Sequence, residues 1–152
     1  MQVSFYELPA SAQAADNALM AHIVELISSN YQQRQYLTVL CSDKKHAEAI
    51  DEYIWQQPPN LFIAHNLLGE GPANGSPVEI TWLSALDSHA IRNKKLVINV
   101  SNQFLPTFAS YQHVVDFVPG DETLKMAARE RYKQYKQAGC RMVFVNADEH
   151  SN

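Results

Sequence analysis

Residues 114–138 constrain the fold most strongly, because they read as a strand, a turn and a long helix in immediate succession. The apolar run at 114–118 is closed by a Pro-Gly pair, which is typical of a turn that follows a β-strand. Asp121 or Thr123 then offers a side-chain oxygen that caps the start of a helix. A strand that leads through a short turn into a helix is the basic unit of an α/β protein.

The helix predicted after this turn has two different faces. Small and apolar side chains on one side are expected to pack on a sheet: Leu124, Ala127, Ala128, Tyr135 and Ala138. The other side carries cations around a tyrosine: Lys125, Arg129, Tyr132, Lys133 and Lys136. Five of the twelve Lys and Arg residues lie between positions 125 and 136, although the chain has a net charge of −4. This face suits an anionic partner with an apolar or aromatic tip, and a solvated face without a binding role is the plain alternative.

Length and composition predict one ordinary globular domain over residues 1–152, with a frayed tail at 146–152. The chain is 46% hydrophobic and 18% charged, which excludes a disordered protein. It shows neither a membrane-spanning run nor a signal peptide, so a cytoplasmic protein is expected. Cys41 and Cys140 lie in strand-like runs without metal-ligand spacing, which predicts buried, free thiols and no metal site.

Strand-like runs alternate with helical patterns along the rest of the chain. Further strands are predicted at 2–8, 36–41, 95–101 and 140–145, and helices at 12–30 and from the cap at Ser42 or Asp43 to the proline pair at 58–59. This order predicts a three-layer α/β domain with a mainly parallel sheet. Some antiparallel pairing is expected in the central part of the chain, where loops and strand-like pieces run together.

An aromatic corner follows the second predicted helix. Trp55, Leu61 and Phe62 bracket the two prolines, so large apolar side chains gather at a helix end and a stiff loop. Such a cluster either fills the margin of the core or forms an exposed anchor for a partner protein. The residues themselves favour neither reading.

The loop Gly69–Gly75 lies between two strand-like pieces, and its G-x-G pattern resembles a phosphate-binding turn. It lacks the dinucleotide fingerprint spacing and the GK[ST] motif, and it leads into VEITW, which is not a helix pattern. His65 would need a partner such as Glu70 or Glu79 to act as a catalytic base, and neither forms a recognisable pattern with it. A nucleotide-binding α/β enzyme that uses this loop is therefore an alternative function, with ordinary loop structure favoured.

Two blocks, HNLLGEGPANGSPVEITW and VVDFVPGDETLKMAARERYKQYKQAG, resemble the chi subunit family of bacterial DNA polymerase III. The likeness is close over residues 51–82 and 114–139, while residues 84–94 and the tail after Cys140 match nothing in the family pattern. The resemblance implies a single Rossmann-like domain without nucleotide binding. It also implies an accessory subunit of the clamp-loader assembly, with no cofactor and with catalysis only at the level of the holoenzyme.

In that family, chi pairs with the psi subunit, which tethers it to the clamp loader. It also holds the acidic C-terminal tail of single-stranded DNA-binding protein (SSB) during DNA replication, so DNA is reached only indirectly. The resemblance places the SSB-tail site at the matching positions Val118, Lys125, Arg129, Tyr132 and Lys133, with Lys136 attracting acidic residues further upstream. It places the psi site at Trp55 and Phe62, the aromatic corner.

The same basic helix also suits direct binding of single-stranded DNA, which is the second alternative function. Competition between short single-stranded DNA and an acidic peptide separates these two readings. Detectable nucleotide binding that is lost when Gly71 becomes bulky would favour the enzyme.

Overall fold

The computed structural model describes residues 1–9, 12–32, 37–56, 65–67, 78–83, 96–105 and 111–146. The elements in chain order are β1 (Gln2–Glu7), α1 (Ala12–Gln32), β2 (Leu37–Cys41), α2 (Lys44–Trp55), β3 (His65–Leu67), β4 (Val78–Trp82), β5 (Leu96–Asn99), β6 (His113–Val118), α3 (Glu122–Gln137) and β7 (Arg141–Val145). Every strand and helix predicted from the sequence is present, with ends that differ by one or two residues in most cases. The tail at 147–152 and the loop at 68–77 lie outside the described residues.

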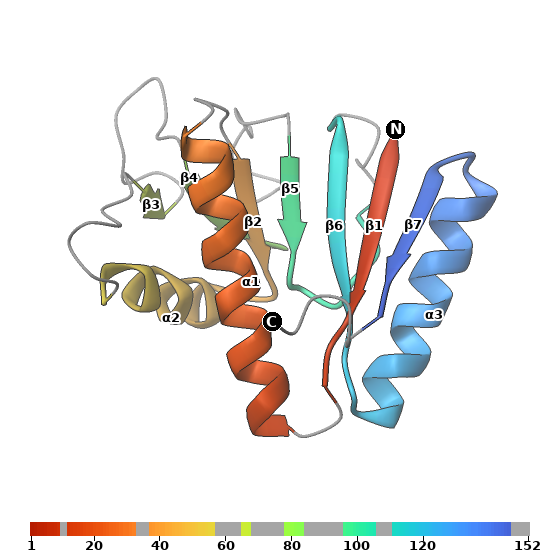
Figure 1. The fold of residues 1–152 in the computed structure, drawn as a ribbon, viewed down its shortest axis with the longest axis horizontal. Helices are drawn as coiled ribbons and strands as arrows, with labels where there is room; N and C mark the ends of the chain where they lie inside the picture. Colours follow the sequence, from red (N-terminus) through yellow and green to blue (C-terminus); the bar gives the residue numbers. More distant parts are fainter. Residues whose placement is uncertain are drawn as a thin grey trace.

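The strands form one seven-stranded sheet in the order β3-β4-β2-β5-β6-β1-β7 (Figure 1). All six pairings between the described strands are parallel. The expected antiparallel pairing in the centre is therefore wrong for the described strands. β3 and β4 are parallel neighbours, and a tight hairpin turn joins only antiparallel strands.

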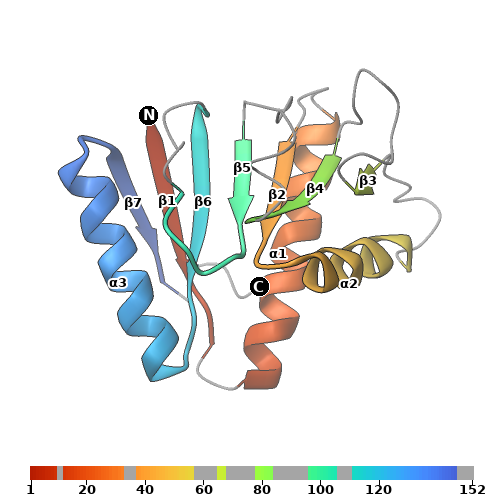
Figure 2. The same ribbon diagram turned by 180° about the vertical axis from the view of Figure 1, so that it is seen from behind.

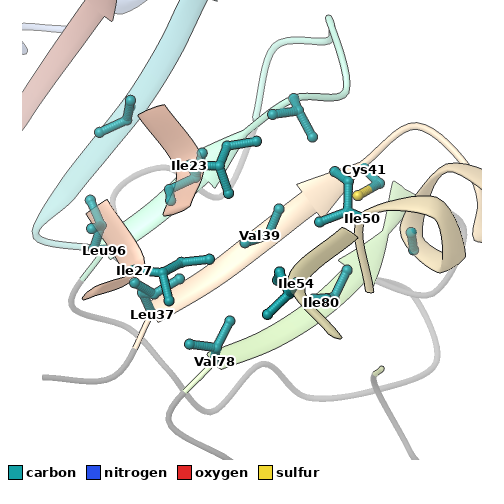
Figure 3. Close-up of a cluster of buried hydrophobic side chains, with 14 of the residues drawn as sticks. Ile23, Ile27, Leu37, Val39, Cys41, Ile50, Ile54, Val78, Ile80 and Leu96 are labelled. Atoms are coloured by element: carbon teal, nitrogen blue, oxygen red, sulfur yellow. The ribbon is translucent and has the colours of Figure 1, made fainter. Parts of the chain in front are cut away.

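Helices cover both faces of the sheet, which confirms the three-layer α/β architecture. On one face, α1 and α2 bury Ile23, Ile27, Ile50 and Ile54 against apolar side chains of β2, β4 and β5 (Figure 3). On the other face, α3 packs against β6 and β7 (Figure 2). The central strand β2 is buried at all five positions because it has a hydrophobic layer on both sides.

Local signals fix the ends of two helices. The Asp43 carboxylate accepts a hydrogen bond from His46 N at 2.8 Å, and the Asp121 carboxylate accepts one from Leu124 N at 3.0 Å. Both are side-chain caps of the kind the sequence predicted, and Asp121 rather than Thr123 is the cap of α3. After α3, Gly139 adopts a φ of 92°, the left-handed conformation that lets the chain leave a helix and enter β7.

The packed face of α3 differs in part from the sequence prediction. Ala128 and Tyr135 are buried as predicted, whereas Leu124 and Ala138 are exposed. The third buried residue of the helix is Arg131, which the sequence analysis left unassigned. Leu124 lies seven residues before Arg131, on the same side of the helix, and is exposed in the first turn of α3, whereas Arg131 faces the sheet.

The two cysteines differ in burial. Cys41 is buried, and desolvation raises the pKa of its thiol to about 12. Cys140 is partly exposed, so the expectation of two buried thiols holds only for Cys41. Among the described helices, none combines the length and the apolar character needed to cross a membrane.

Candidate functional site

The carboxyl ends of β6, β1 and β7 present one continuous floor to α3. The strand register places Phe5 between Asp116 and Phe144, and it places Glu7 beside Val118. Because in-register neighbours in a sheet point to the same face, these side chains all lie on the side that α3 covers.

Tyr132 of α3 rests on this floor. Its ring meets that of Phe5 edge-on, with centroids 5.3 Å apart and an interplanar angle of 61°. The Tyr135 ring lies one turn further along and packs on Phe5 and Phe104. The Tyr135 hydroxyl accepts a hydrogen bond from Leu105 N at 3.1 Å, and burial raises its pKa to about 12.

A buried ion pair fixes the helix to the floor. Arg131 Nε donates to Asp116 Oδ2 at 3.0 Å, and Arg131 Nη2 donates to Asp116 Oδ1 at 3.1 Å, which is a two-pronged contact. The same guanidinium donates to the carbonyls of Asn102 and Phe117. Burial pushes the pKa of the Asp116 carboxyl upward, while the Arg131 charge and the donated hydrogen bonds oppose that rise.

The network continues into the loop after β5. Asn99 Nδ2 donates to Asp116 Oδ2 at 3.3 Å and to the Gln103 carbonyl at 2.8 Å. Ser101 donates to Asn99 Oδ1 through both its backbone N–H and its hydroxyl. Asn102, with a φ of 62°, turns its carbonyl to Arg131; a left-handed conformation is tolerated by asparagine better than by most residues. These contacts hold the rotation of α3 relative to the sheet.

A cleft of about 360 Å³ opens beside this anchored region, between the first part of α3 and the ends of the strands. Its lining residues are Glu7, Val118, Lys125, Ala128, Arg129, Tyr132, Lys133 and Phe144. Open parallel sheets commonly bind ligands at the carboxyl ends of their strands, and the cleft has this position. Its volume suits one or a few side chains.

The structure brings five of the six residues of the sequence-predicted tail site to this cleft: Val118, Lys125, Arg129, Tyr132 and Lys133. Lys136 is exposed on α3, almost a turn beyond Lys133, and is not among the lining residues. Sequence reasoning missed Glu7 and Phe144 as lining residues and assigned Ala128 only to packing. No local sequence pattern links Glu7 and Phe144 to α3, because only the order of the strands brings them close to this helix.

The cations of the cleft are lightly paired. Lys125 lies 3.9 Å from Glu122, and Lys133 lies 3.5 Å from Glu130, in both cases one turn apart on the solvent side. Exposed pairs of this kind contribute at most about 1 kcal/mol. An anionic ligand therefore replaces Glu122 or Glu130 as the partner of these lysines at little cost in free energy.

The other candidate sites fall largely outside the described residues. Trp55 ends α2 and is 57% exposed, whereas its predicted companion Phe62 lies outside the described residues. The loop Gly69–Gly75 and Glu70 also lie outside them, and Glu79 is buried within β4. Within the described ranges, no group of three or more His, Cys, Asp and Glu side chains could hold a metal ion.

Comparison with known proteins decides the family. The family model described as "DNA polymerase III chi subunit, HolC" matches residues 1–143. The chain belongs to the DNA polymerase III chi subunit family. The resemblance noted from the two sequence blocks is thereby confirmed.

Individual relatives agree with this membership. The chain is 37% identical over 117 residues to DNA polymerase III subunit chi of Escherichia coli, covering 77% of this chain and 78% of that protein. It is 37% identical over 122 residues to the same subunit of Haemophilus influenzae, covering 80% of this chain and 82% of the relative. The Pseudomonas aeruginosa subunit is 23% identical over 141 residues, covering 91% of each.

A solved structure outside the chi family shares the fold alone. The crystal structure of T4 UvsW superposes with a TM-score of 0.62 at 14% identity, covering 95% of this chain and 41% of that one. The chain thus spans about two-fifths of that protein. The likeness supports the α/β fold and carries no functional assignment.

Proposed function

We propose that this member of the chi family is a non-catalytic bridge within the DNA polymerase III assembly. Its cleft under α3 holds the acidic C-terminal tail of SSB, and its corner at the end of α2 contacts psi, which leads to the clamp loader. The cleft itself supports the first contact, because three cations of α3 line one side of a floor that is apolar apart from Glu7. A chain with these two contacts meets DNA only through SSB and needs no cofactor.

The chemistry of the cleft matches an acidic peptide. Arg129 and Lys125 offer charge-assisted hydrogen bonds to a terminal carboxylate, while Val118 and Tyr132 supply apolar surface beside them. Lys133 lies at the rim on the same helix face and attracts acidic side chains further upstream. Charge-assisted bonds contribute about 1.5–3 kcal/mol each, less where water and salt screen them. Their sum suits a contact of about −8 kcal/mol, which is micromolar and exchangeable.

The test is fluorescence anisotropy of a labelled SSB-tail peptide titrated with this protein and with Arg129→Ala. We expect micromolar binding by the natural chain and a loss of about tenfold or more in the variant. Arg141→Ala is the matched control, because it removes the same charge from an exposed position that does not line the cleft. Equal binding by all three proteins would place the peptide elsewhere.

The same titration separates the rival functions. A direct single-stranded DNA binder predicts that short single-stranded DNA displaces the peptide at physiological salt. A bridging subunit predicts that it does not. A nucleotide-binding enzyme predicts heat on mixing with a nucleotide in calorimetry, and template-directed incorporation by the isolated chain would contradict a non-catalytic role.

The psi contact is supported by Trp55, which is 57% exposed at the last position of α2. A tryptophan exposed to this degree is a common anchor of protein interfaces. We expect Trp55→Ala to weaken binding of psi in calorimetry while leaving binding of the tail peptide unchanged. Met126→Ala, at a 64% exposed position on α3, is the control for loss of exposed apolar surface.

A further inference from the structure

One carboxylate lies among the residues that line the cleft, and the proposed peptide site gives it no role. Glu7 is the last residue of β1 and is half-buried, whereas the other charged lining residues are the three cations of α3. Like charges that are brought together disfavour binding, so a neutral residue at this position would attract anions more strongly. Glu7 therefore lowers the affinity of the cleft for negatively charged groups.

The strand pairing directs this carboxylate into the cleft. Val3 and Phe5 of β1 belong to the buried cluster that packs under α3, and every second side chain of a strand lies on the same face. Glu7 is the next member of this row and lies in register with Val118. The pairing continues beyond it, because Leu8 N donates to the Val118 carbonyl at 2.9 Å. An apolar, buried row thus ends in a charged residue on the floor of the cleft.

Glu7 differs in position from the glutamates of α3 that lie near the cleft cations. Glu122, beside Lys125, and Glu130, beside Lys133, have side chains that are 82% and 70% exposed. Water and salt screen such exposed charges, and they screen a half-buried charge less. Glu7 therefore acts more strongly than Glu122 or Glu130 on an anion that enters the cleft.

Two kinds of anionic chain suit a basic helix face, and Glu7 does not affect them equally. An acidic peptide with an apolar end can direct its terminal carboxylate to Arg129 or Lys125 and leave only uncharged atoms beside Glu7. A single-stranded nucleic acid carries a phosphate on every nucleotide, and its affinity for a groove depends on the positive charge along that groove. A carboxylate within the groove therefore costs nucleic acid more affinity than it costs the peptide.

We propose that Glu7 is the residue by which the cleft rejects single-stranded nucleic acid while it accepts an acidic peptide. The inference rests on the proposed function, since it takes an acidic peptide as the occupant of the cleft. It adds a specificity-determining carboxylate from β1 to a site whose cations all come from α3. A chain that holds SSB works beside single-stranded DNA, where this discrimination is needed.

The experiment measures binding of a peptide and of an oligonucleotide by the same variants. A labelled acidic peptide and a labelled short oligothymidylate are titrated by anisotropy with the natural chain, Glu7→Gln and Glu130→Gln. The ionic strength is about 0.05 M, at which weak binding of a polyanion is readily measured. Glu130→Gln is the matched control, because it removes the same charge from a side chain of α3 that does not line the cleft.

We expect Glu7→Gln to raise the ratio of oligonucleotide affinity to peptide affinity by about tenfold, as the loss of one close like-charge contact would give. Glu130→Gln should change this ratio by less than about twofold. Unlabelled peptide should displace the oligonucleotide from Glu7→Gln, because both then occupy the cleft. Glu7→Asp keeps the charge and should keep most of the rejection.

The outcomes distinguish this inference from the proposed function. If Glu7→Gln leaves the ratio unchanged, or if the natural chain binds the oligonucleotide as tightly as the peptide, the inference fails while the cleft remains the peptide site. If the natural chain does not bind the peptide, the proposed function and the inference both fail. Thermal unfolding of each variant establishes that the fold is intact, and Glu7→Ala is a second neutral variant with the same expected shift.

Discussion

Arg129 and Arg131 lie two residues apart on the same helix and have opposite surroundings. Arg131 is 2% exposed and donates four hydrogen bonds, two of them to the buried carboxylate of Asp116. Arg129 is exposed and lines the cleft. One arginine is committed to the position of α3, and the other remains open to a ligand. The surroundings of a cation, and not its residue type, therefore decide whether it stabilises the fold or is available to a binding site.

Both roles depend on the same packing. The Asp116–Arg131 contact sets how α3 lies on β6, and Val118, two residues after Asp116, forms part of the cleft floor. The helix therefore presents Arg129 and Tyr132 to the floor at a fixed angle. A preorganised site of this kind loses less entropy when a peptide binds.

The largest expected effect comes from replacing Arg131 with methionine. The change leaves Asp116 buried without its counter-ion, and we expect the free energy of unfolding to fall by about 3–5 kcal/mol. Urea denaturation measures the free energy of unfolding. Arg129→Met is the matched control, and we expect it to change that free energy by no more than about 0.5 kcal/mol. Equal losses in the two variants would remove the distinction between the arginines.

A double variant sharpens that result. Arg131→Met combined with Asp116→Leu removes both charges, and we expect it to regain most of the lost stability because no buried charge is left unpaired. A double variant as unstable as the single one would show that shape, and not charge pairing, makes Arg131 important.

Next in size is the effect of Arg129 on binding. We expect Arg129→Ala to weaken binding of the acidic peptide by about tenfold or more. The affinity of Arg129→Lys should lie between those of the alanine variant and the natural chain. Lysine keeps the charge but loses the planar fork that can hold a carboxylate by two bonds. Anisotropy measures the affinity of both variants. A lysine variant that binds as tightly as the natural chain would contradict a contact in which the guanidinium holds a carboxylate by two hydrogen bonds.

The response to ionic strength distinguishes the exposed Arg129 from the buried Arg131 without a substitution at the cleft. Raising ionic strength from about 0.05 M to about 0.5 M should weaken peptide binding several-fold, because the cleft cations are exposed to screening. The difference in unfolding free energy between the natural chain and Arg131→Met should change little, because the ion pair is buried. Peptide affinity that does not respond to salt would argue against a charge-based site.

The smallest expected effect is that of Lys136→Ala. This lysine belongs to the basic face predicted from the sequence, but it does not line the cleft. We expect the variant to weaken peptide binding by less than about twofold, as a distant and screened charge would. A loss as large as that of Arg129→Ala would show that the peptide runs further along α3 than the cleft.

The sequence predicts well what local geometry determines. Helical spacing placed Lys125, Arg129, Tyr132 and Lys133 on one face, and they do line one cleft. Turn and capping residues located the start of α3, and the alternation of strands and helices gave the α/β class. Each of these features depends on residues within one or two turns of one another.

What the sequence could not show depends on strand order. Glu7 and Phe144 reach the cleft only because β1 inserts between β6 and β7, a pairing between segments from opposite ends of the chain. Arg131 was missed because a charge within a polar helix ordinarily faces water. Asp116, a carboxylate inside an apolar strand, was the available signal that a buried cation lies opposite.

The most direct test of the central claim, that the cleft under α3 is the peptide site, is a titration of ¹⁵N-labelled protein with the acidic tail peptide followed by amide chemical shifts. The claim predicts that the largest shift changes lie at Val118, at 125–133 of α3 and at the end of β7. It also predicts that α2 and its exposed Trp55 remain unchanged. Changes that centre on α2, or on any surface that leaves Val118 and Arg129 unaffected, would contradict it.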